Sequence, residues 1–199
     1  MKFVHTVGIF ILFAAFSAFA ADSDPSALVK SNTDEVLRVI KQSKDKGALY
    51  DLAEQKISSH FDFQAMTRFA VGRSWREASP EQQRKLESAF RGLLVRTYTT
   101  ALSQSNLADV AVDVKPAPVK PGQDEVTVRT VARQSGKQPV SIDYRMTRGA
   151  GDWKVSDVII ENLSLVTNYR DSFAAEINRS GIDGLIKTIE TKNRSLAGI

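Results

Sequence analysis

Few side chains in this sequence can act as acids, bases or nucleophiles near neutral pH. There is no cysteine, which excludes disulfides, thiolate catalysis and cysteine-ligated zinc sites. Once a predicted N-terminal signal segment is removed, His60 is the single histidine, and no G-x-S-x-G elbow supplies a serine for it to activate. Metal-binding and nucleotide-binding motifs such as H-E-x-x-H, EF-hand loops, G-x-G-x-x-G and P-loops are also absent. We therefore predict no catalytic residue, no metal site and no cofactor.

One enzymatic alternative stays open. A curved sheet wrapped by helices can enclose an apolar cone that holds an acid, a tyrosine and an arginine. Asp143 and Tyr144 are adjacent in a predicted strand, so they face opposite sides of it and cannot both line one pocket. A buried carboxylate with a raised pKa could still come from another segment.

Residues 61–83 combine large apolar side chains with arginines. Phenylalanines, Met66 and Trp75 fall within 15 positions and alternate with Arg68, Arg73 and Arg76. A guanidinium group binds phosphate or carboxylate through paired hydrogen bonds. The three arginines are therefore candidates to contact a lipid head group or a partner, and for Arg76 pairing with a structural carboxylate is the alternative.

The N-terminus indicates export. Lys2 precedes a ten-residue apolar run, and small residues stand at positions 18 and 20, which is typical of a signal peptide cleaved after Ala20. The run is shorter than the roughly 18 residues that span a bilayer. We predict a signal peptide over residues 1–20 and a single periplasmic domain over residues 21–199. Its net charge of +3 is dispersed, which suggests no nucleic-acid partner and only weakly favours anionic lipids.

The elements that must position these residues begin with helices. Apolar spacing and start signals predict helices over residues 25–44, 48–58 and 80–102, with a short helix capped by Asp62 and ended by Gly72 between them. The 80–102 helix opens with Ser79-Pro80-Glu81-Gln82, which can form a capping box. Its apolar side chains are spaced to line one face, so we expect it to lie across a broad surface.

From residue 108 onward, apolar residues recur at every second position, as they do in half-buried strands. Alternation predicts strands over residues 110–114, 126–128, 140–147 and 152–160, with a bulge near Asp157 where the alternation slips. Helices are expected over residues 164–180 and from Asp183 onward. Helices followed by an antiparallel sheet of about four strands give an α+β fold.

Two blocks of the sequence carry motifs that identify a family. Residues 61–102 carry F-D-F, then Met66, Arg68, Gly72, Trp75-Arg76, the P-E-Q helix start and F-x-x-L-L-x-x-x-Y. Residues 153–192 carry Asp157, the S-L-V-x-N-Y-R run, Phe173, Gly181 and Gly184-Leu185-Ile186. Together the two blocks resemble the MlaC family, also called the toluene-tolerance auxiliary family.

The resemblance implies an NTF2-like curved sheet wrapped by helices, with an apolar cavity between them. It also implies a periplasmic carrier that shuttles phospholipid between an outer-membrane lipoprotein–porin complex and an inner-membrane ABC transporter with MCE-domain subunits. We expect a monomer whose cargo is the bound phospholipid. The alternatives are a carrier of another lipid such as a hopanoid, and an NTF2-like enzyme acting on a small apolar substrate.

The residues expected to line such a cavity are large and apolar. Periodicity alone cannot separate a cavity wall from a closed core, and the resemblance favours the cavity. The expected lining residues are Phe69, Trp75, Phe90, Leu93, Leu94, Tyr98, Val128, Val140, Ile142, Tyr144, Met146, Val155, Leu165 and Phe173.

Overall fold

The computed structural model describes residues 24–42, 45–107, 109–149 and 151–198. The predicted signal peptide lies outside the described residues, as do residues 43–44 at the end of the first predicted helix. The N-terminal half is helical, as predicted. Its elements are α1 (Pro25–Gln42), α2 (Lys46–Leu52), the π-helix η1 (Ala53–Ile57), the 3₁₀ turn η2 (Ser58–His60), α3 (Phe63–Val71), the 3₁₀ turn η3 (Gly72–Arg76) and α4 (Pro80–Gln104).

The C-terminal half is an antiparallel sheet followed by two helices, which confirms the α+β prediction. The sheet has the order β1-β2-β3-β4-β5, so every strand pairs with its sequence neighbour. The elements are β1 (Ala111–Val114), β2 (Glu125–Arg133), β3 (Val140–Arg148), β4 (Trp153–Ile160), β5 (Leu163–Ser164), α5 (Leu165–Asn168) and α6 (Arg170–Ala197).

The fifth strand was not predicted, because two residues are too few to show alternation. It returns from β4 through a tight turn at Glu161 and Asn162, whose φ angles are 48° and 66°. Two consecutive positive φ angles are typical of the turn that joins two-residue hairpins, and asparagine tolerates that conformation well.

Local sequence signals act where they were expected. The Ser79 hydroxyl accepts a hydrogen bond from the Gln82 backbone N–H at 3.2 Å, and the Gln82 side chain accepts one from the Ser79 N–H at 3.0 Å. This is the predicted capping box of α4. Asp62 caps α3 by accepting from the Ala65 N–H at 2.8 Å.

The predicted bulge in β4 is present and has a structural consequence. Arg145 pairs with Asp157 but Met146 pairs with Val155, so Ser156 is the extra residue. Because one residue is inserted, Val155 and Val158 face the same side of the sheet, the side of Tyr144 and Met146.

The predicted break between the last two helices coincides with Gly181 inside α6. Its φ of 72° and ψ of −178° are not helical, so α6 bends there. The region of φ and ψ that it occupies is essentially restricted to glycine.

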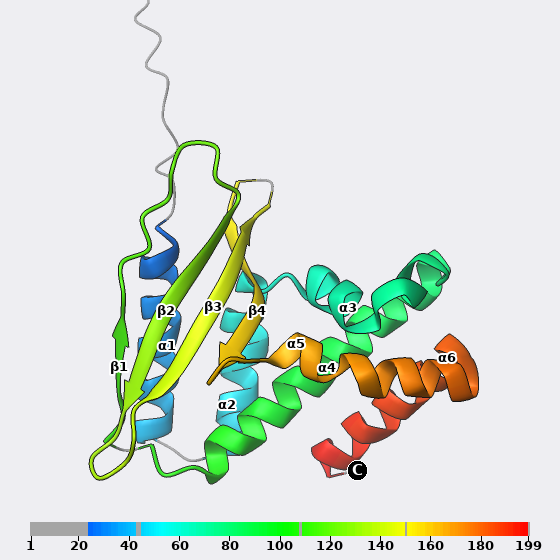
Figure 1. Cartoon of the computed structure of the whole chain (residues 1–199). Helices are drawn as coiled ribbons and strands as arrows, with labels where there is room; N and C mark the ends of the chain where they lie inside the picture. Colours follow the sequence, from blue (N-terminus) through cyan, green and yellow to red (C-terminus); the bar gives the residue numbers. More distant parts are fainter. Residues whose placement is uncertain (1–23, 43–44, 108, 150, 199) are drawn as a thin grey trace, which may run out of the picture.

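Two hydrophobic clusters form the interior. One joins α3, η3, α4, α5 and α6, and the other joins α1 to the sheet. In Figure 1, α1 and α2 lie behind the sheet, and α4 crosses from the helical end toward the turn between β2 and β3. Within the described residues, no helix is both long and apolar enough to cross a membrane.

Candidate functional site

A cavity of about 500 Å³ lies between the two hydrophobic clusters. Its walls come from the face of the sheet that packs against α1 and from α1, α2, η1 and the C-terminal half of α4. Most of the side chains that face it are aliphatic or aromatic, and its volume is that of an ordinary small-molecule pocket.

Helix α1 supplies one wall. Val29, Val36 and Ile40 recur at helical spacing, so they project from the face that meets the sheet. Asn32 and Thr33 lie on the same face. The wall continues along α2 and η1 with Leu49, Leu52, Ala53 and Ile57.

The sheet supplies the opposite wall. Ile142 and Tyr144 of β3 pair with Ile160 and Val158 of β4, and side chains in register on antiparallel strands share one face. All four line the cavity, together with Val155. Val155 and Val158 can both contribute because of the bulge at Ser156.

Helix α4 forms the third wall with Leu94, Val95, Tyr98, Thr99 and Leu102. These residues occupy the C-terminal half of the helix, near the sheet. The N-terminal half instead packs against α6, so α4 uses two faces rather than the single face that was predicted.

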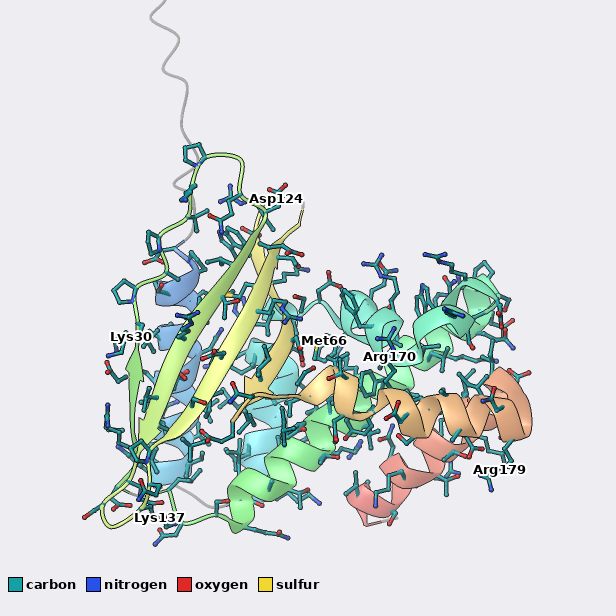
Figure 2. All side chains as sticks on the ribbon, in the orientation of Figure 1. Lys30, Met66, Asp124, Lys137, Arg170 and Arg179 are labelled. Atoms are coloured by element: carbon teal, nitrogen blue, oxygen red, sulfur yellow. The ribbon has the colours of Figure 1, made fainter. Side chains whose placement is uncertain are left out.

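The cavity opens at the turn between β2 and β3. Arg133, Gln134, Lys137 and Gln138 line this end, and Val140 beside them is 36% exposed. The Gln134 amide donates to the Asn106 carbonyl at 2.6 Å, which ties the turn to the segment after α4. Lys137 lies at the tip of this turn in Figure 2. The mouth therefore combines polar and cationic side chains with an apolar interior.

The interior contains two tyrosines that stay protonated far above neutral pH. Burial raises the pKa of Tyr98 to about 12, and the nearby Tyr169 adds to the shift. Burial also raises the pKa of Tyr144, and a hydrogen bond with Thr33 across the cavity partly opposes that shift. Of the described residues that line the cavity, none is an aspartate, a glutamate or a histidine. The arrangement can exclude water and hold hydrocarbon.

Half of the residues expected at a cavity lie on its wall. These are Leu94, Tyr98, Val140, Ile142, Tyr144, Val155 and Leu165.

The other half lie elsewhere. Trp75, Phe90, Leu93 and Phe173 belong to the helical cluster, where the ring of Phe90 packs edge-on against Tyr169 and Phe173 at centroid distances of 5.1 and 5.3 Å. Val128 and Met146 lie on the same face of the sheet as Tyr144 but are 0% exposed, in the solid packing beside the cavity. Phe69 is 50% exposed on α3.

The three arginines also lie off the cavity wall. Arg68, Arg73 and Arg76 are exposed on α3 and η3. Arg68 stacks over the exposed Phe69 ring at 5.7 Å, and none of the three forms an ion pair with a carboxylate in the described part of the chain. The pairing of Arg76 with a structural carboxylate is therefore not observed among these residues.

Sequence reasoning missed the wall formed by α1, α2 and η1. The helical spacing of apolar residues in α1 was visible, but it did not reveal what the apolar face would meet. Phe61, Phe63 and Met66 were noted as apolar but not assigned to the cavity, and they close its deep end.

Comparison with known proteins agrees with this architecture. The family model described as MlaC protein matches residues 30–191. The toluene tolerance protein ttg2D of Pseudomonas putida is 28% identical over 191 residues, covering 92% of this chain and 86% of that protein. The intermembrane phospholipid transport system binding protein MlaC of Haemophilus influenzae is 21% identical over 178 residues, covering 85% and 82%.

A solved structure is similar over nearly its whole length. It is the phospholipid-binding protein from Ralstonia solanacearum in complex with a phospholipid, with 35% identity and a TM-score of 0.77, and the match covers 88% of this chain and 99% of that chain. The family model matches residues 30–191, which is most of this chain, so the chain belongs to the MlaC family.

Proposed function

We propose that the protein binds a phospholipid by its acyl chains and carries it through the periplasm. The observation that supports this most is the apolar cavity of about 500 Å³ between sheet and helices, with a polar mouth. The similar protein from Ralstonia solanacearum was solved with a phospholipid bound, and the relative from Haemophilus influenzae is named as a phospholipid transport binding protein.

The energetics of lipid transfer explain why such a cavity is needed. Two acyl chains with about 28 methylenes would cost on the order of 20 kcal/mol to expose, at about 0.8 kcal/mol for each methylene. A phospholipid therefore does not cross water unaided. A carrier must offset most of this cost without exceeding it, because a lipid held too tightly is not delivered. Binding and release need no covalent step.

The shape of the cavity suggests how the lipid lies in it. The tails run inward along Leu94, Ile142 and Tyr144. The head group stays at the mouth, where Arg133 and Lys137 can donate charged hydrogen bonds to its phosphate.

The arginines of α3 and η3 then have a different role from the head-group contact considered for them. Arg68, Arg73 and Arg76 are exposed on α3 and η3 and do not line the cavity, and Arg68 lies over the exposed ring of Phe69. We assign them to contact with the membrane complexes that load and unload the carrier. By family resemblance these complexes are an outer-membrane lipoprotein–porin complex and an inner-membrane ABC transporter with MCE-domain subunits.

Two alternatives have less support. A hopanoid is rigid and fused-ring, whereas the ligand of the similar solved protein is a phospholipid. An NTF2-like enzyme needs a proton donor or acceptor in the pocket, and the described lining residues include no carboxylate or imidazole. Asp157 is buried, but it pairs with Arg145 on the opposite face of the sheet from Tyr144.

Lipid analysis tests this proposal. The mature protein is purified without detergent, extracted with organic solvent and analysed by mass spectrometry. We expect phospholipid in the extract, and transfer of labelled phospholipid between two vesicle populations when the protein is added. A hopanoid in the extract would support the first alternative. Protein that is free of lipid and takes up none from vesicles would contradict carriage.

A further inference from the structure

The deep end of the cavity is closed by two stacked phenyl rings. The centroids of Phe61 and Phe63 are 5.7 Å apart and the rings are within 18° of parallel. The backbone at Phe61 forms a parallel bridge to Val155, and the Asp62 N–H donates to the Val155 carbonyl at 2.9 Å. These contacts fix the rings to β4 rather than leaving them on a free loop.

The strand register shows how deep the rings lie. Val140 and Ile160 stand at the end of the sheet near the mouth, and the cavity continues inward past Tyr144 and Val158 to Val155. Phe61 is at the level of Val155, so it stands at the far end from the mouth.

A second pocket of about 410 Å³ also borders the two rings, and most of its lining side chains are polar or charged. Phe61, Phe63 and Ser58 line both spaces, so the partition between them is one side chain thick. The polar pocket also contains Glu87, Arg91, Lys154 and Asp62. Arg91 lies over the ring of Phe63 at 5.6 Å and pairs with Glu54.

Ser58 marks the same boundary. It is 8% exposed, and its hydroxyl is buried without a hydrogen-bond partner in the described part of the chain. Elsewhere the deep end abuts solid packing, since Met146 beside Val155 and Trp153 beyond it are at most 2% exposed.

We infer that the Phe61–Phe63 pair sets the length of the acyl chain that the cavity holds. This inference rests on the proposed function. A tail that enters from the mouth meets the rings with its terminal methyl group. Further methylenes would have to pass between the rings into a pocket of charged groups, where they displace water from ions and gain no apolar contact. The partition therefore favours tails that end at the rings and disfavours longer ones.

The experiment measures which tail lengths bind. The mature protein is incubated with vesicles that contain equal amounts of phosphatidylglycerols with myristoyl, palmitoyl, stearoyl or arachidoyl tails, and bound lipid is identified by native mass spectrometry. Phe61→Ala removes one ring of the partition and lets a longer tail replace it. We expect its preference to shift toward longer tails, by about fourfold for each additional methylene that finds apolar space.

Two further variants make the result specific. Ser58→Val adds methyl groups at the partition and should shift the preference toward shorter tails. Phe69→Ala removes a phenyl ring from the same segment but on the exposed surface of α3, away from the cavity, and should leave the preference unchanged.

The outcomes separate this inference from the proposed function. Wild-type protein that binds no phospholipid would overturn the function itself. Wild-type protein that binds phospholipid, with the same tail preference in Phe61→Ala and Ser58→Val, would overturn the inference and leave the function intact. If thermal melting shows that Phe61→Ala does not fold, Ser58→Val decides: a shift to shorter tails supports the partition, and an unchanged preference overturns it.

Discussion

Replacing Ile142 with glutamate puts a carboxylate on the part of the cavity wall that the sheet forms. Ile142 lies between Thr130 of β2 and Ile160 of β4, and its side chain faces the cavity. In the empty cavity, which opens at the mouth, the carboxylate can stay hydrated. The protein should therefore fold, and the cost should arise when an acyl chain displaces that water.

The size of the effect follows from the cost of neutralising the acid. A hydrated glutamate has a pKa of about 4.3, so protonating it at pH 7 costs about 3.7 kcal/mol, which is about a 500-fold loss of affinity. At pH 5 the same step costs about 1 kcal/mol, or about a fivefold loss. We therefore expect Ile142→Glu to bind phospholipid weakly at neutral pH and to recover roughly 100-fold in affinity between pH 7 and pH 5.

Equilibrium binding of a fluorescent phospholipid across this pH range measures the effect. Ile142→Gln is the matched control, because it has a similar size and polarity but does not titrate. Its affinity should be lower than that of the wild type and independent of pH. Circular dichroism at each pH shows whether both variants remain folded.

A folded Ile142→Glu protein that binds as tightly as the wild type at pH 7 would refute the placement of Ile142 on the lipid-binding wall. If the phospholipid affinity of the glutamate and glutamine variants depends equally on pH, the pH dependence comes from a titrating group other than the introduced glutamate.

Three other variants test separate parts of the structure. Reversing the charge of both Arg73 and Arg76 to glutamate should leave the bound lipid unchanged and weaken capture by the membrane complexes; lost lipid in a folded variant would place these arginines at the cavity. Gly181→Ala should lower the free energy of unfolding by about 1–3 kcal/mol in urea titrations, because alanine is strained at φ 72° and ψ −178°; unchanged stability would mean that the bend in α6 relaxes freely. Burial raises the pKa of Tyr98 from 10.0 to about 12. As the pH rises, the tyrosine therefore loses its proton in the unfolded chain before it does so in the folded protein. The contribution of this group to the free energy of unfolding is present below pH 10 and is lost as the pH rises toward 12. Tyr98→Phe should lack this part of the alkaline loss when the free energy of unfolding is measured against pH, and an identical alkaline profile would contradict the assignment.

The features that sequence reasoning predicted are those with local causes. The capping box at Ser79 depends on four consecutive residues, and strand β3 shows unbroken alternation from Val140 to Met146. The bulge in β4 was predicted near Asp157 from a slip in that strand's own alternation, and the structure places it at the neighbouring Ser156. Such signals depend on neighbouring residues, so they can be read without knowing the tertiary structure.

The division between wall and solid core could not be predicted in the same way. Phe90 and Leu94 are one helical turn apart on α4, and they are 0% and 5% exposed. Phe90 packs against Tyr169 and Phe173, whereas Leu94 faces the cavity. Apolar spacing indicates that a side chain is buried. It does not indicate whether that side chain packs against other side chains or faces a cavity.

The part of the cavity wall that α1 forms could not be predicted for a related reason. Its apolar stripe predicts a partner, but the partner is a sheet that begins about seventy residues later in the chain. Phe69 was predicted to line the cavity, and this prediction was wrong, because the residue is 50% exposed. Its apolar side chain suggested burial, yet α3 is short and turns this residue away from both hydrophobic clusters.

A crystal structure of the protein loaded with phospholipid tests the central claim most directly. We predict elongated density between the sheet and α1, α2 and α4, running along Ile142 and Tyr144 toward Phe61, with the head group beside Lys137. Density for the lipid outside this space, or a cavity that stays empty when lipid is bound at one molecule per protein, would contradict the account.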